Sequence, residues 1–379
     1  MSRHLFILLI TLCCCEVHAA ESVGSDSTHR GIIGRIIDYF GNANRPREHD
    51  KFDISFIGGP HYSSDSKFGI GLVAAGAYNL DHTDTLDLYR SNVAVKLDMT
   101  TAKHFKLEFE GENIFPEDRS RLAYSIELSS VETRFWGIGY DECHDDASES
   151  HYRYLAVDAN LSQVWRIAPQ FYVGPLLVVN YTDGRKFAKP EMWGGEPNDA
   201  FSWGTGISLR YDTRDCLTEP HTGVALRLDQ QFRGRWLGNS RGFNVNEFTA
   251  SAYKPVWKGG ILAGRVHWRC TWGDTPWCFL STIGGSDNMR GYFDGRYRDK
   301  NEADICVELR QHVWRRNGIV CWVGAATLFP RFSDIEVAHV LPNAGIGYRW
   351  EFKDRMNVRV DLGFGRHQTG FIFSINEAF

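Results

Sequence analysis

The 379-residue chain has no run of 18 or more apolar residues after its first twenty positions. A membrane-spanning helix needs about 20 predominantly apolar residues, so helical spans are excluded. The first segment, 1–20, reads as a secretory signal. Arg3 precedes an apolar run from Leu5 to Cys15, which is too short to span a bilayer, and Ala19 offers a small-residue cleavage position. We therefore expect an exported mature protein.

The sequence also lacks the short motifs of common enzymes and metal sites. It contains no HExxH, no GxSxG, no phosphate-binding glycine loop and no EF-hand loop. No CxxC pair or His/Cys cluster has zinc-ligand spacing. The acidic segment from Asp141 to Glu149 is compatible with divalent cations at the cell surface, but a solvated loop is the simpler interpretation. We predict no enzymatic activity, no cofactor and no metal site.

Neither sign of charge is in large excess, because the chain contains 42 Lys and Arg residues and 47 Asp and Glu residues. The net charge of −5 argues against a nucleic-acid partner. Six cysteines follow the predicted signal. Cys270 and Cys278 are close enough in sequence to form a disulfide in an oxidising compartment, and free thiols are the alternative.

What the chain does have is segments in which apolar and polar residues alternate with a period of two. Between Asp304 and Trp314, one face carries Ile305, Val307, Leu309 and Val313, and the other carries Asp304, Glu308, Arg310 and His312. One apolar face and one polar face fit strands with lipid outside and a polar lumen inside. A charge facing the bilayer midplane would cost about 2–4 kcal/mol, so these charges must point inward.

About sixteen such strands can be placed from Lys51 to Phe379, joined by short turns that alternate with long polar loops. This pattern is typical of a bacterial outer-membrane barrel. We predict an all-β fold, a closed antiparallel transmembrane β-barrel over residues 51–379. The preceding segment, 21–50, contains a short amphipathic helix from Gly31 to Gly41. The longest loop, Gly273–Asp304, is rich in aromatic residues that favour burial, and it is expected to fold back against the rest of the protein.

Three features resemble the BamA/TamA family of outer-membrane assembly barrels, also called the bacterial surface antigen family. The first is the loop sequence that contains Gly284, Gly285, Arg290, Gly291 and Tyr292. The second is the set Asp212, Arg214, Asp215, Pro220 and Gly223. The third is the aromatic Phe379 at the end of the predicted last strand. The resemblance covers most of residues 51–379, and implies a barrel without the periplasmic repeat domains of the family.

The resemblance implies that the loop enters the barrel and that its arginine, Arg290, pairs with acids on the inner wall. Glu308 stands at the family's acidic position in the next strand, and its parity independently points it inward. The family's second acid would fall at Gly324, which has no carboxylate. Two alternatives follow: the clamp is weaker than in the family, or another acid such as Asp304 or Asp361 substitutes. The alternative is that Arg290 only fixes the loop, without a part in transport.

The seam between the first and last strands is the second candidate site. Phe52–Ile57 runs into Gly58, Gly59 and Pro60, which weaken strand order and remove a backbone donor. We expect few hydrogen bonds at the outer end of the seam, where Gly58, Gly59 and Pro60 lie. The other strand of the seam is the predicted last strand, which ends at Phe379. In the family this seam is a lateral gate where a client strand adds by β-augmentation. An ordinary frayed strand end is the alternative.

By resemblance, the chain assists insertion or transport of outer-membrane proteins, or lipids, in the bacterial outer membrane. The expected partners are outer-membrane lipids, client outer-membrane proteins and a separate periplasmic protein. Two alternatives are a channel restricted by its inward loop and a surface structural or adhesive barrel.

Overall fold

The computed structural model describes residues 52–63, 66–78, 80, 91–353 and 355–379. These residues belong to one compact unit. The predicted signal and the predicted helix from Gly31 to Gly41 lie outside the described residues. In the described part of the chain, no helix is both long and apolar enough to cross a membrane.

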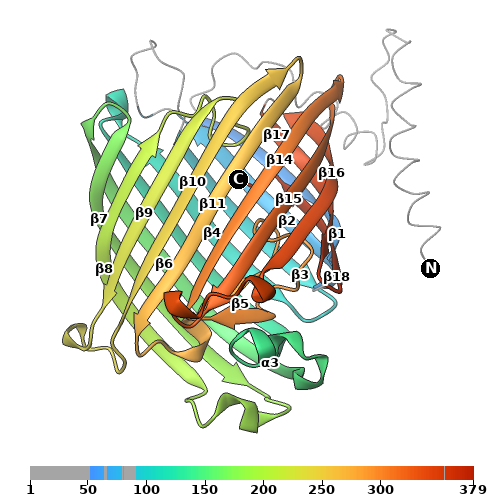
Figure 1. Ribbon diagram of the computed structural model, residues 1–379. Helices are drawn as coiled ribbons and strands as arrows, with labels where there is room; N and C mark the ends of the chain where they lie inside the picture. The colour runs from blue at the N-terminus through green and yellow to red at the C-terminus, as the bar shows by residue number, and fades with distance from the viewer. Residues whose placement is uncertain (1–51, 64–65, 79, 81–90, 354) are drawn as a thin grey trace, which may run out of the picture. The chain divides into compact units, whose positions relative to one another are not determined.

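Within the described residues, sixteen strands form one antiparallel sheet in which each strand pairs with the next strand of the sheet order (Figure 1). The first eight are β1 (Phe52–Ser63), β2 (Lys67–Tyr78), β3 (Ser91–Thr100), β4 (Phe105–Ile114), β5 (Ser120–Phe135), β6 (Ser150–Ala168), β7 (Phe171–Arg185) and β8 (Asp199–Asp212). The other eight are β9 (Gly223–Arg233), β10 (Phe243–Trp257), β11 (Gly260–Gly273), β14 (Asn301–Trp314), β15 (Asn317–Phe329), β16 (Leu341–Lys353), β17 (Met356–Gly365) and β18 (Gln368–Ile375). The predicted strand number is confirmed.

Smaller elements lie in the connections. β12 (Ser281–Ile283) and β13 (Tyr297–Asp299) form a separate two-stranded sheet between β11 and β14. The α-helix α3 (Tyr140–His144) lies between β5 and β6. Seven short 3₁₀ turns complete the described part: Pro116–Asp118, Asp146–Ser148, Pro190–Trp193, Arg235–Leu237, Trp277–Phe279, Phe332–Asp334 and Val337–His339.

The two faces of the sheet differ in the way that the alternation predicts. On β14, the apolar Ile305 and Val307 are 49% and 41% exposed, whereas the charged Asp304 and Glu308 are 5% and 0% exposed. Exposed large apolar side chains recur along the sheet, on strands from β1 to β18. An apolar outer face and a charged inner face are what a bilayer and a polar lumen require.

Connection lengths separate the two ends of the sheet. Short turns join β6 to β7, β10 to β11, β14 to β15 and β16 to β17. Long loops follow β5, β7, β11 and β15, and Figure 1 shows them gathered with α3 at the lower end of the sheet. Since bacterial barrels keep short turns inside and long loops outside, the end with α3 is the outer end.

The sheet curls back so that its two edge strands, β1 and β18, are in contact (Figure 1). The rings of Tyr62 and Phe371 lie 6.2 Å apart across this seam. We expected the first strand to end at Gly58, Gly59 and Pro60. These residues instead lie inside β1, opposite Leu72, Gly71 and Ile70 of β2. Pairing with β2 continues to Ser63, because a proline is tolerated in an edge strand.

The chain end departs from the prediction that Phe379 finishes the last strand. β18 ends at Ile375, and Asn376 has a φ of +64°, a left-handed conformation that asparagine tolerates. The tail of residues 376–379 turns to the inner face, where Glu377 pairs with Arg349 at 2.8 Å. The Phe379 backbone oxygen accepts a hydrogen bond from Arg310 at 2.7 Å. Charge pairing with the inner wall therefore replaces the last four positions of the strand.

Of the two states considered for Cys270 and Cys278, the disulfide is wrong, because both cysteines are free thiols. Cys270 is buried on β11, and Cys278 lies in the 3₁₀ turn Trp277–Phe279. Burial raises the pKa of Cys278 to about 12, so this thiol is a poor nucleophile.

Candidate functional site

The loop between β11 and β14, residues 274–300 (the lumen loop), has its own apolar core. It begins with a 3₁₀ turn and closes through the β12–β13 pair, in which Ile283 is opposite Tyr297. The loop shares a core of buried side chains with the wall and with the β5–β6 connection, which contains α3. This core consists of Trp136, Cys143, Ile283, Met289, Tyr292, Tyr297, Ala326, Leu328 and Leu341. Each large apolar side chain buried in this way contributes about 1.5–3 kcal/mol. The aromatic content of the loop thus explains why it packs against the wall.

Arg290 ties the lumen loop to two strands of the wall (the loop clamp). Its Nη2 donates to Glu308 Oε2 of β14 at 2.5 Å, and its Nη1 donates to Asp361 Oδ2 of β17 at 2.7 Å. The guanidinium carbon also lies 3.7 Å from the ring centroid of Trp322. The predicted pairing of Arg290 with Glu308 is confirmed, and Asp361 is the substitute for the missing acid at Gly324.

All three side chains of the clamp are removed from solvent: Arg290 is 2% exposed, and Glu308 and Asp361 are 0% exposed. Burial alone would lower the pKa of Arg290, but the charges of Glu308 and Asp361 hold that pKa above its ordinary value. The guanidinium therefore stays charged at physiological pH.

The clamp continues into a network on the inner wall that reaches the tail. Arg310 donates to Glu308 at 2.7 Å, and Arg349 donates to Asp361 at 2.5 Å. Both arginines also pair with Glu377, at 3.7 Å and 2.8 Å. Alternating charges thus connect the lumen loop to the tail.

Behind the clamp, the loop backbone touches the wall directly. Gly291 has a φ of +120°, and a Cβ there would lie 2.7 Å from the carbonyl carbon of Gly363 on β17. In return, a Cβ on Gly363 would lie 2.1 Å from the Arg290 carbonyl oxygen. The Tyr292 hydroxyl donates to the Pro342 oxygen at 2.6 Å, and the Phe293 amide donates to Gln368 of β18 at 2.9 Å. The loop is therefore fixed to β16, β17 and the seam strand β18.

Gly284 and Gly285 precede these contacts and have φ values of +117° and +105°. They carry the chain from β12 into the segment with Arg290, and a Cβ on Gly284 would lie 2.5 Å from the Phe293 oxygen. All loop residues of the predicted site therefore lie in one segment that faces β14–β18.

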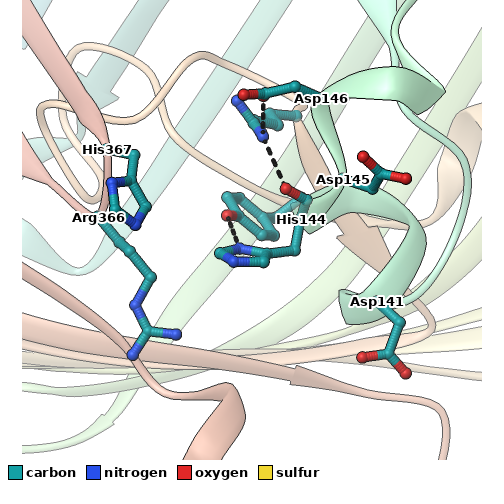
Figure 2. Close-up of a pocket in the computed structure, with 8 residues that line it drawn as sticks. Asp141, His144, Asp145, Asp146, Arg366 and His367 are labelled. Atoms are coloured by element: carbon teal, nitrogen blue, oxygen red, sulfur yellow. Dashed lines mark hydrogen bonds and ion pairs between the residues drawn. The ribbon is translucent and has the colours of Figure 1, made fainter.

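At the outer end, the lumen loop meets the β5–β6 loop around a pocket of about 470 Å³ (Figure 2). Arg296 donates to the Cys143 oxygen at 3.0 Å and to Asp146 at 2.7 Å. His144 Nδ1 lies 3.2 Å from the Tyr297 hydroxyl. One face of the pocket is formed by Arg366 and His367, from the turn between β17 and β18. The acidic loop predicted from the sequence thus supplies an anion for Arg296.

The second family signature forms the turn between β8 and β9 at the other end of the barrel. Asp212 pairs with Arg214 at 2.8 Å, and Asp215 pairs with Arg355, beside β17, at 2.9 Å. Pro220 is buried in this turn, and Gly223 begins β9. Four strands separate β9 from β16 in the sheet, so the turn reaches across the inner end of the barrel.

Sequence reasoning found Arg290, Glu308 and the loop but missed much of what surrounds them. The alternation of side chains along each strand places Arg310 and Arg359 on the inner face, but it does not predict which acidic side chain either arginine pairs with. Arg349 and Trp322 enter the site because strand register brings them there. The tail was missed altogether, since it was assigned to the last strand.

The fold and the clamp define a class: a 16-stranded outer-membrane barrel whose outer loop is fixed inside its lumen. A sequence model of the Omp85 superfamily domain matches residues 49–336. The chain belongs to the Omp85 superfamily, whose barrels reside in the bacterial outer membrane and act in transport and assembly rather than as enzymes.

Similar solved structures agree with this fold. BamA from Haemophilus ducreyi lacking POTRA domains 1–3 is 12% identical with a TM-score of 0.55, and the match covers 87% of this chain and 71% of that one. CdiB from Acinetobacter baumannii is 12% identical with a TM-score of 0.53, covering 87% and 60%. CdiB from Escherichia coli is 10% identical with a TM-score of 0.54, covering 93% and 71%. No curated protein sequence matches the chain.

Proposed function

We propose that this barrel assists the insertion or transport of outer-membrane proteins, or lipids, through the seam between β1 and β18. The observation that carries the proposal is the unequal length of the two edge strands. β1 has 12 residues and β18 has 8, because the tail leaves the sheet after Ile375. β1 is therefore four residues longer than the strand that it meets at the seam.

An edge strand that lacks a full partner is a template for another chain, because its backbone donors and acceptors can add a strand. The glycines and Pro60 of β1 favour the same role, since they weaken order in that strand. The loop clamp supports a lateral route over an axial one: the lumen loop occupies the inner wall beside this seam and narrows the path along the barrel axis.

The test uses the purified full chain in proteoliposomes. An unfolded outer-membrane barrel is diluted from urea, and its folded fraction is followed by heat-modifiable gel migration. We expect the protein to accelerate folding at least several-fold over empty vesicles. The matched control is the chain with a disulfide that locks β1 to β18.

Planar-bilayer recording distinguishes the channel alternative. A small, intermittent conductance is expected if the lumen loop stays in place. Large, steady conductance without acceleration of folding contradicts the proposal and favours a channel.

A further inference from the structure

We infer that the inner wall carries a site for a divalent transition-metal cation, formed by His267 of β11 with Glu302 and Asp304 of β14. The ligand atoms of these three side chains all lie within 4.8 Å of one another. The site lies outside the loop clamp, and no sequence motif indicated it.

Strand register creates this cluster. In the β11–β14 pair, His267 lies directly opposite Asp304, and Arg269 lies opposite Glu302. His267 Nδ1 faces both carboxylates, 2.8 Å from Asp304 Oδ2 and 3.3 Å from Glu302 Oε1. One imidazole nitrogen and two carboxylates are therefore directed at a single point.

Burial indicates that the cluster is a built site rather than a solvated patch. His267, Glu302 and Asp304 are 7%, 3% and 5% exposed. Glu302 Oε2 is buried and has no hydrogen-bond partner among the described residues. An unpaired buried carboxylate oxygen is costly, and a bound cation would satisfy it.

The other imidazole nitrogen supports the same conclusion. Nε2 of His267 lies 3.7 Å from Glu247 of β10. A histidine that binds a metal usually donates its second N–H to a carboxylate, which fixes the ring orientation. Glu247 stands on the side of the ring where this carboxylate is needed, although 3.7 Å is longer than a direct hydrogen bond. Glu247 also lines a polar cavity of about 270 Å³.

The donor set defines the class of ion. Calcium and magnesium prefer oxygen ligands alone, whereas imidazole with carboxylates suits Mn²⁺, Fe²⁺, Co²⁺ or Zn²⁺. The cation would displace the proton shared by His267 and Asp304. Arg265 lies 3.8 Å from Asp304 and weakens the site without blocking Glu302. A bound ion would link β11 to β14 where the lumen loop leaves the wall.

The test uses the tag-free full chain in detergent after treatment with a chelator. Mn²⁺ is the first probe, because it binds thiolates weakly and should therefore not bind to the six cysteines. In a second titration, Zn²⁺ is added to compete with Mn²⁺ for the site. Electron paramagnetic resonance should give about one bound Mn²⁺ per chain. Pulsed electron paramagnetic resonance of the wild type should detect magnetic coupling between an imidazole nitrogen and the bound Mn²⁺.

His267→Gln, Glu302→Gln and Asp304→Asn should each weaken Mn²⁺ binding about 10-fold or more, and Glu247→Gln should weaken it by about 10-fold. Asp158→Asn, which removes a lumen carboxylate bonded to Asn180, is the matched control and should bind as the wild type does. Heat-modifiable migration checks that each variant is folded. Absence of saturable binding, equal affinity in all variants, or no nitrogen coupling in the wild type would overturn the inference.

Discussion

At the scale of single residues, Arg290 balances two buried carboxylates from different strands. A buried charge-assisted pair contributes about 1–3 kcal/mol, but removing one partner costs more because the other charge remains buried and unpaired. The planar guanidinium suits this geometry, since it can donate to Glu308 and Asp361 from separate nitrogens.

We expect Arg290→Ala and Glu308→Ala each to destabilise docking of the lumen loop by about 3–5 kcal/mol. The double variant should cost less than the sum of the two, because the residues share one interaction. Limited proteolysis between Tyr292 and Arg298 measures the effect. Arg241→Ala is the control, since its pair with Glu196 is partly exposed. Strict additivity would contradict a direct coupling.

A second prediction concerns the close contact of the loop backbone with β17. Gly363→Ala would place a methyl group 2.1 Å from the Arg290 oxygen, so the loop must shift and the clamp must lengthen. We expect protease sensitivity similar to that of Arg290→Ala. Gly264→Ala, where a Cβ meets nothing within 4 Å, should leave the loop unchanged. Equal behaviour of the two alanine variants would show that the loop does not depend on this contact.

At the scale of elements, the turn between β8 and β9 is held across the inner end by Asp215 and Arg355. Arg355 also donates to the Glu219 oxygen at 2.9 Å, and Thr218 donates to the Arg355 oxygen at 2.7 Å. This set of bonds connects parts of the sheet that no strand pairing joins. The signature Asp212–Gly223 therefore acts as a structural connection in this barrel.

The turn should open in acid. Burial alone would raise the pKa of Asp215, but hydrogen bonds from the Thr222 and His221 amides and from Arg355 hold it below its ordinary value of 3.8. The stabilisation is therefore present above about pH 4 and is lost as the pH falls through the depressed pKa. Hydrogen exchange of residues 213–222 at pH 6 and pH 3 measures this change, when it is expressed as protection relative to the intrinsic exchange rate at each pH. Asp215→Asn should have low protection at both pH values; a persistent loss of protection in acid in that variant would assign the effect elsewhere.

At the scale of the whole molecule, the lumen loop, the tail and β18 form one connected system. The loop contacts β18 through Gln368. Glu377 of the tail pairs with Arg349, which also donates to the clamp residue Asp361. A change at the seam would therefore disturb the clamp, and loss of the clamp would loosen β18. In the function proposed above, this coupling would connect opening of the seam to movement of the lumen loop.

Locking the seam tests this idea. A cysteine pair at Tyr62 and Phe371, whose rings are 6.2 Å apart, should form a disulfide between β1 and β18 in a background without the native thiols. We expect the locked barrel to fold but to lose its activity in the vesicle assay, with recovery on reduction. A pair at Ala74 and Val95, opposite each other on β2 and β3, should have no effect. Full activity of the locked seam would favour the channel or scaffold alternatives.

The sequence by itself determined the sheet and the direction of its side chains. Period-two alternation identifies strands because successive side chains point to opposite faces, and turn lengths assign the two ends of the barrel. The pairing of Arg290 with Glu308 was implied by the family resemblance, and the parity of Glu308 independently directed its side chain inward. Polarity along one strand is a local property, so it can be read without knowledge of the fold.

Only the tertiary structure decided which distant residues meet. Asp361 replaces the missing acid because β17 lies beside the loop, and His267 meets Asp304 because β11 pairs with β14 in a particular register. The tail turns inward because Arg310 and Arg349 offer its residues charged partners that an exposed strand end lacks. Such contacts depend on strand register and barrel curvature, which the pattern of a single strand does not contain.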